Sequence, residues 1–342
     1  MRMSIRAGIL AACLAGATGA SAQSQPQAMS CRVDKEIRAA EQAKPQQVAL
    51  GLVTALLAGD AAGVDKALTP EARAALGEGG LERQVRSVAA EAPYSDIRVA
   101  HTYLIEVKSG EEPFPPIVCG KSLTDPDTVM LAMRARPQQV HVEVTARSRN
   151  NEWSVFVFLA PEQSAWRVLS FEMHVAGISG RSSQDLNRLA IEQKGRGHGL
   201  NAMLLMKAAL AATDRGPNAR TIWRLDLQNA LKALATPPEL SGEAPYPWTF
   251  DGRTYRIGTL GVIGLGGDLD LLIYRLADEW SGNTAADADS RVLIEALVKA
   301  HPELRESFPA IIVRALKPDQ SGGWATTFQF AKGFGQPPPP GN

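Results

Sequence analysis

The chain has 342 residues, and its 36 Lys and Arg residues balance its 36 Asp and Glu residues, so that its formal net charge at pH 7 is zero. This balance excludes the basic footprint of most nucleic-acid-binding proteins, so we expect no nucleic-acid partner. A composition of 45% hydrophobic and 21% charged residues excludes a disordered, collagen-like or coiled-coil protein, and the length allows two ordinary domains.

The N-terminal segment 1–22 has the pattern of a secretory signal peptide. Two arginines form its basic start, an apolar stretch covers 7–19, and Ala20-Ser21-Ala22 is a cleavage site of the A-x-A type. We therefore expect cleavage after Ala22 and a periplasmic or secreted protein. No stretch of the chain has about 20 apolar residues without a charge or a proline, so the sequence predicts no transmembrane segment.

A lipoprotein signal is a competing interpretation of the same segment, because Leu10-Ala11-Ala12-Cys13 resembles a lipobox whose cysteine is lipidated. Few residues precede this motif, however, and the apolar stretch continues beyond Cys13 to the A-x-A site. The sequence also lacks a second anchoring signal. We therefore expect cleavage after Ala22 rather than a lipid anchor at Cys13.

Removal of the signal peptide would leave two cysteines, Cys31 and Cys119. Disulfides persist in exported proteins because the compartments outside the cytoplasm are oxidising. We therefore predict a disulfide between Cys31 and Cys119, which would tie the N-terminal segment to the proline-rich loop at 111–116. The alternative is two unpaired thiols that behave as small buried hydrophobic side chains.

The first part of the remaining chain has the pattern of four helices. Apolar residues recur at the spacing of one helix face over 34–58, which predicts the first helix. Asp60 is placed to cap a second helix, and Thr69 before Pro70 is placed to cap a third. Apolar residues at helical spacing over 81–88 indicate the fourth.

The pattern then changes to the two-residue repeat of a half-buried strand over 97–107. Four further strands are predicted at Thr128–Met133, Val140–Arg147, Trp153–Leu159 and Trp166–Val175. The turns between them are short enough for an antiparallel meander. The sequence therefore predicts an α+β domain over 34–178.

This order of elements resembles that of the NTF2-like superfamily. The residues that carry the resemblance are the paired strands Trp153-Ser154-Val155-Phe156-Val157 and Trp166-Arg167-Val168-Leu169. The resemblance implies a cone in which the N-terminal helices pack into the concave side of a curved antiparallel sheet. In enzymes of this superfamily, such as ketosteroid isomerase and SnoaL-type cyclases, an apolar cavity in the cone holds an Asp base or a His.

The polar residues at the helix-to-sheet junction are the weak catalytic candidates that this resemblance implies: Tyr94, Asp96, His101 and Tyr103. Strand alternation places His101 on the same apolar face as Val99, where a neutral imidazole can act as a base. The alternative is a histidine at the edge of the core with one satisfied hydrogen bond. The sequence has no residue-level active-site pattern of these enzymes, so no catalytic role is carried over.

Two strands of the predicted meander each carry a histidine and a glutamate, His141 with Glu143 and His174 with Glu172. These residue types suit a metal site or a general acid/base pair. Apolar residues alternate with them along both strands, however, which predicts that the four polar side chains lie on a solvent-exposed face. We therefore expect neither a metal site nor a cofactor.

Small residues over 177–183 predict a linker between domains. Three apolar helix faces follow within 182–235, and the first two form a hairpin that resembles a tetratricopeptide unit. Because a solenoid needs about three such repeats, we expect a helical hairpin subdomain rather than an array.

The last part of the chain predicts a small mixed α/β unit over 245–332. Asp251-Gly252 is the central dipeptide of a predicted β-hairpin. A strand at Leu269–Leu276, a helix at Asp287–Ala300 and a final strand pair follow. The proline-rich tail 333–342 is expected to be extended and disordered.

These patterns predict an exported protein that serves in non-catalytic binding or scaffolding in the periplasm, because the cone offers a cavity and the hairpin a groove while neither carries a chemical signature. The partner would be an envelope protein or a small apolar ligand. A cavity enzyme of the isomerase or hydrolase type is the first alternative. A protein-interaction module that uses the helical hairpin is the second.

Overall fold

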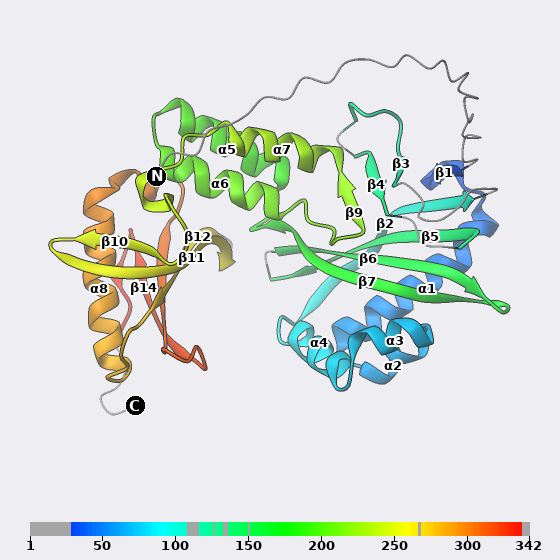
Figure 1. Ribbon diagram of the computed structural model, residues 1–342, viewed down its shortest axis with the longest axis horizontal. Helices are drawn as coiled ribbons and strands as arrows, with labels where there is room; N and C mark the ends of the chain where they lie inside the picture. Colours follow the sequence, from blue (N-terminus) through cyan, green and yellow to red (C-terminus); the bar gives the residue numbers. More distant parts are fainter. Residues whose placement is uncertain are drawn as a thin grey trace, which may run out of the picture.

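The computed structural model describes residues 29–107, 116–125, 127–132, 136–149, 151–265 and 268–336. The predicted signal peptide, the lipobox, most of the proline-rich loop at 111–116 and residues 337–342 of the predicted tail lie outside the described residues. The fold is α+β, with two six-stranded sheets at the two ends of an elongated molecule (Figure 1). None of the helices within the described ranges is long and apolar enough to cross a membrane.

Four helices precede most of the first sheet, as the sequence predicts. They are α1 (Ala39–Ala58), α2 (Ala61–Ala67), α3 (Pro70–Leu76) and α4 (Gly80–Ala89). Gly59 ends α1 in the left-handed conformation, with φ +81°. The side chains of Asp60 and Thr69 accept backbone hydrogen bonds at the starts of α2 and α3, which confirms both predicted caps. Asp34 does not begin the first helix but a short 3-10 turn, Asp34–Glu36.

The first sheet is antiparallel throughout and strongly curled, with the strand order β1-β2-β5-β6-β7-β8. Its strands are β1 (Met29–Val33), β2 (Tyr94–Val107), β5 (Gln138–Ser148), β6 (Asn151–Glu162), β7 (Ala165–Ile178) and β8 (Arg181–Ser182). The strands β5, β6 and β7 form the predicted meander. The predicted linker at 177–183 is instead a tight turn between β7 and β8, so the sheet continues through it.

Helices α1–α4 cover one face of this sheet, here called the helix-covered face (Figure 1). Leu52 and Leu56 of α1 pack there with Val142 of β5 and with Val155 and Val157 of β6, and all five side chains are fully buried. Each such side chain contributes about 1.5–3 kcal/mol through its removal from water. The space between α1 and the sheet is therefore occupied by a packed core.

A small three-stranded sheet covers part of the opposite face, here called the outer face, which carries Tyr103, Phe156 and Phe158. Its strands, in the order β3-β4-β9, are β3 (Ile117–Cys119), β4 (Val129–Leu131) and β9 (Ala219–Thr221). The strand predicted at Thr128–Met133 therefore does not belong to the meander, because its described part pairs with β3 and β9. The sheet is assembled from segments that are far apart in the chain.

Three helices and the second sheet form the remainder of the molecule. The helices are α5 (Ser183–Gly195), α6 (Gly199–Ala211) and α7 (Ile222–Lys232). The second sheet contains β10 (Tyr246–Phe250), β11 (Arg253–Leu265), β12 (Asp268–Leu276), β13 (Ala310–Leu316), β14 (Gly323–Gln329) and β15 (Gly333–Phe334). Asp251 and Gly252 both have positive φ between β10 and β11, which confirms the predicted hairpin turn. Helix α8 (Asn283–Ala300) connects the parallel strands β12 and β13.

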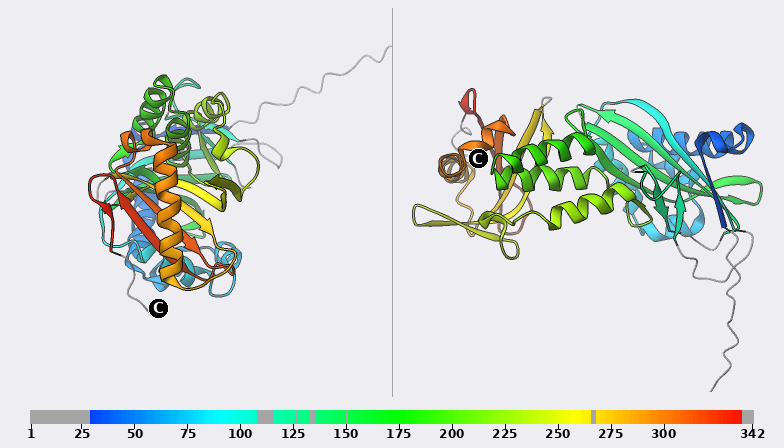
Figure 2. Two further views of the ribbon diagram at one scale, coloured as in Figure 1. Left: turned by 90° about the vertical axis from the view of Figure 1, so that its left-hand side faces the viewer. Right: turned by 90° about the horizontal axis from the view of Figure 1, so that it is seen from above.

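The helical segment and the second sheet share one hydrophobic core. Leu186 of α5 and Leu204 of α6 are buried in the same cluster as Ile273 of β12 and Val313 of β13. Figure 2 shows α5, α6 and α7 between the two six-stranded sheets. The disordered tail was predicted to begin at residue 333, but Gly333 and Phe334 form β15, which pairs with β14. The predicted start of the tail is therefore wrong.

Candidate functional site

Polar side chains lie in register across the outer face of the first sheet. In one row, His101 of β2 pairs with Glu143 of β5, Glu143 with Phe156 of β6, and Phe156 with Glu172 of β7. The next row consists of Tyr103, His141, Phe158 and Ser170. Residues that are directly opposite each other on neighbouring strands share a face, so the topology brings these side chains together.

A β-bulge at Ala100 turns His101 toward the outer face. Val99 pairs with Val144, whereas His101 pairs with Glu143, so β2 contains one extra residue between them. Val99 consequently packs against the helix-covered core, while Tyr103 belongs to the outer-face cluster. The prediction that His101 shares a face with Val99 is wrong for this reason.

The centre of the outer face is buried rather than exposed. His141 is 0% and Glu143 is 6% exposed, so the prediction of a solvated polar face is wrong for these two residues. The small sheet and the segment 213–218 cover them. Within this cover, the Oε1 atom of Glu143 accepts a hydrogen bond from Ser154 at 2.6 Å and pairs with Arg215 at 2.7 Å. This buried ion pair fixes the segment between α6 and β9 on the first sheet.

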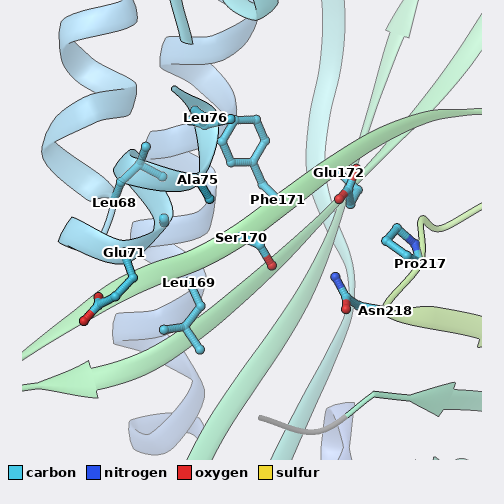
Figure 3. Close-up of a pocket in the computed structure, with 11 residues that line it drawn as sticks. Leu68, Glu71, Ala75, Leu76, Leu169, Ser170, Phe171, Glu172, Pro217 and Asn218 are labelled. Atoms are coloured by element: carbon cyan, nitrogen blue, oxygen red, sulfur yellow. The ribbon is translucent and has the colours of Figure 1, made fainter. Parts of the chain in front are cut away.

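Glu172 and His174 lie at one flank of the outer face and are half-buried. A cleft of about 400 Å³ separates α3 from this part of β7 and is here called the β7 cleft (Figure 3). Apolar residues such as Leu76 and Phe171 form one side of it, and Glu172 and Asn218 lie toward the other. Burial raises the pKa of Glu172, although the neighbouring His174 opposes this shift.

His101 lies at the opposite flank, where it meets a residue that the sequence did not indicate. The Nδ1 atom of His101 is 2.9 Å from Oδ2 of Asp34, and the backbone N–H of Thr102 donates to Oδ1 of Asp34 at 2.7 Å. Asp34 has a φ of +49°, a left-handed conformation that is uncommon for a non-glycine residue and is often found at functional sites. Since a carboxylate can only accept, Nδ1 carries the proton, and Nε2 remains for another partner.

The pocket around this pair has a volume of about 450 Å³ and is here called the Asp34 pocket. Val33, Tyr103 and Cys119 contribute to its apolar wall. Its charged lining residues are Asp34, Lys35, Glu36, Lys121, Asp125 and Asp127. Four carboxylates thus face two ammonium groups, so the pocket has an acidic lining.

Tyr103 is a deeply buried side chain of the Asp34 pocket, with 2% of its surface exposed. Burial raises the pKa of Tyr103 far above its usual range, and the negative charges of Glu143 and Asp34 raise it further. The phenol therefore remains protonated at neutral pH and serves as a neutral wall.

The other candidates from the helix-to-sheet junction lie apart from this pocket. Asp96 has a positive φ at a first bulge of β2, and its exposed carboxylate is 3.4 Å from Arg147. The hydroxyl of Tyr94 donates to the carbonyl of Val88 in α4. Neither residue lines the Asp34 pocket, so the structure brings together His101 and Tyr103 but not Asp96.

The predicted disulfide between Cys31 and Cys119 is present and joins β1 to β3 beside the Asp34 pocket. A disulfide fits an oxidising compartment outside the cytoplasm. Among the residues that the structure describes, no group of His, Cys, Asp and Glu side chains is arranged to hold a metal ion.

The helices at 182–235 present little apolar surface. The large apolar side chains of α6 are buried in the shared core except for Leu210, which is partly buried, and those of α7 are at least partly buried. Ile191 of α5 is the one large hydrophobic side chain that is exposed in this described segment.

Searches with protein-family models, with curated protein sequences and with solved structures gave no match for this chain.

Proposed function

We propose that the protein is an exported, non-catalytic binding protein of the periplasm and that the Asp34 pocket is its small-molecule site. The observation that carries this proposal is the contact between Asp34 and His101, in which a backbone hydrogen bond fixes a strained aspartate inside a pocket. The pocket volume of about 450 Å³ lies within the range of small-molecule sites. The signal-peptide pattern and the disulfide support the location.

The lining of the Asp34 pocket indicates the chemistry of the ligand. Its excess of carboxylates favours a cationic or hydrogen-bond-donating group, because such a group compensates for their desolvation. Tyr103 and Val33 offer apolar contact to the remainder of the molecule. We therefore expect a small molecule with an apolar body and an amine-like head group.

The arrangement of the first unit also supports the resemblance to the NTF2-like cone, because four helices pack on one face of a curled antiparallel sheet. In that case the proposed site differs from the cavity of the superfamily enzymes. The Asp34 pocket lies on the face that the helices leave free, whereas the helix-covered face is packed with apolar side chains.

A thermal-shift screen tests the binding function. We would screen the protein against small primary amines and their neutral analogues, and compare it with the variants Asp34→Asn and Asp226→Asn. Asp226 is an exposed aspartate of α7 outside the pocket and serves as the matched control. Amines are expected to stabilise the wild type and Asp226→Asn, and to bind Asp34→Asn about tenfold more weakly or worse, because a charged hydrogen bond is lost. Equal binding by Asp34→Asn, or no binding by the wild type, would refute the proposal.

A cavity enzyme is the second candidate, and the geometry of His101 favours it. A carboxylate that holds Nδ1 of an imidazole orients Nε2 as a general base, and such a base contributes typically 10²–10⁴-fold to a rate. Among the described residues that line the pocket there is no serine and no free cysteine thiol, so water or the substrate itself would lose the proton. Hydrolysis of small chromogenic esters by the wild type and its loss in His101→Gln would support this candidate, and equal rates would exclude it.

A further inference from the structure

A second pocket lies at the flank of the outer face that is remote from Asp34, where β7, the segment 214–217, β9 and α7 meet. It has a volume of about 370 Å³ and is here called the seam pocket. Its polar lining residues are His174, Asp214, Arg220, Arg224 and Gln228. Pro217 lines both this pocket and the β7 cleft, so the two are adjacent.

Two arginines supply the positive charge of the seam pocket. Nη1 of Arg224 donates to the carbonyl of Leu210 at 3.0 Å and to Oγ1 of Thr213 at 3.4 Å, so this guanidinium is fixed against the wall. Arg220 of β9 is exposed and forms no ion pair with any residue in the described part of the chain. One guanidinium is therefore pre-positioned, and the other remains available to a ligand.

The acidic residues of the seam pocket do not cancel this charge. Oδ1 of Asp214 accepts from the backbone N–H of Gly216 at 3.0 Å, and Oδ2 lies 3.8 Å from Nδ1 of His174 and 3.9 Å from Arg224. The Asp214 charge is thus shared between two partners. Glu172, whose Oε2 is 4.0 Å from Nε2 of His174, lines the adjacent β7 cleft and not the seam pocket.

We propose that the seam pocket binds a small molecule through an oxyanion group, a carboxylate or a phosphate, held between Arg220 and Arg224. The planar fork of a guanidinium matches the geometry of both oxyanions and forms charge-assisted hydrogen bonds with them. The Gln228 amide offers a further donor. The volume lies at the small end of the range for ligand pockets, which fits a small molecule rather than a polymer. The seam pocket and the Asp34 pocket are separate sites, and neither proposal depends on the other.

Isothermal titration calorimetry with inorganic phosphate, and separately with succinate, tests this site. We would compare the wild type with Arg220→Gln and with the control Arg86→Gln, which removes an exposed arginine of α4. We expect saturable binding of at least one anion to the wild type and to Arg86→Gln, and binding about tenfold weaker in Arg220→Gln, because charge-assisted hydrogen bonds are lost. The preferred anion identifies the source of the oxyanion.

Three results would overturn the proposal. The first is the absence of saturable binding of either anion to the wild type, and the second is an affinity of Arg220→Gln equal to that of the wild type. The third is a loss of affinity in Arg86→Gln as large as that in Arg220→Gln, which would indicate a nonspecific charge effect. Because Arg220 is an exposed residue on a short strand, its replacement by glutamine should leave the fold intact, and circular dichroism of the variant checks this.

Discussion

Removal of the disulfide should destabilise the protein strongly. The bond between Cys31 and Cys119 spans 88 residues of sequence, and the chain-entropy relation for a loop of that size gives a stabilisation of ~4.6 kcal/mol at 25 °C. The bond acts mainly on the unfolded chain, whose conformational freedom it restricts. In the folded protein it also holds β1 against β3 beside the Asp34 pocket, so its loss should weaken ligand binding as well.

Chemical denaturation followed by circular dichroism measures this effect in the double variant Cys31→Ala, Cys119→Ala. Because Cys119 is fully buried, the variant also loses side-chain packing, and the wild type under reducing conditions serves as a control that keeps both side chains. We expect both to unfold at lower denaturant concentration than the oxidised wild type, by an amount that corresponds to ~4–5 kcal/mol. A difference in the free energy of unfolding below about 1 kcal/mol would contradict the stabilisation expected from the disulfide. Two free thiols in the exported protein would contradict the disulfide itself.

Three further substitutions test the packing. Leu56→Ala should cost ~2–5 kcal/mol, since it opens a cavity beneath α1, and an unchanged denaturation midpoint would show that the core is not packed there. Gly216→Ala should cost at least ~1–2 kcal/mol, because Gly216 has a φ of +81° and a Cβ atom would lie 2.6 Å from Cγ of Glu172; a neutral effect would contradict this contact. Asp287→Ala should cost ~2–3 kcal/mol, because its carboxylate accepts hydrogen bonds from Arg291 and Thr326 under the second sheet. Burial disfavours ionisation of Asp287, but these hydrogen bonds outweigh the effect of burial and lower the pKa of Asp287. The ionised carboxylate therefore stabilises the fold above about pH 4, and this stabilisation is lost as the pH falls further. Denaturation of the wild type and of Asp287→Ala across that pH range should show that the difference in their free energies of unfolding becomes smaller as the pH falls. A difference that does not change with pH would refute the stabilising role of the Asp287 carboxylate.

Features with a local cause were predictable from the sequence. Asp60 and Thr69 cap helices because their side chains bond to backbone groups only three residues ahead. Asp251 and Gly252 form a hairpin turn because both tolerate positive φ. Such interactions need no knowledge of the remainder of the fold.

The burial of the outer face was not predictable from strand alternation alone. Its cover consists of the segment 213–218 and the small sheet of β3, β4 and β9, and β9 follows β4 only after four sheet strands and two helices. His141 and Glu143 therefore have the alternation of exposed residues although they are buried. One signal was available, since the run 155–160 of β6 is apolar on both faces, which is typical of a strand covered on both sides.

The Asp34 pocket depends on two backbone irregularities that have no sequence signature. The bulge at Ala100 moves His101 to the other face of β2, and the left-handed conformation of Asp34 directs its carboxylate toward that ring. The sequence indicated His101 and Tyr103 as candidates. It did not indicate Asp34, because a helix pattern covers that position.

A crystal structure of the protein with an amine from the thermal-shift screen would show whether a small molecule binds in the Asp34 pocket. We expect ligand density inside the pocket, with the amine near the carboxylate of Asp34 and a contact to Nε2 of His101. Binding in the Asp34 pocket would be contradicted if an amine that stabilises the protein in solution gave density only elsewhere on the molecule and left this pocket empty in the crystal.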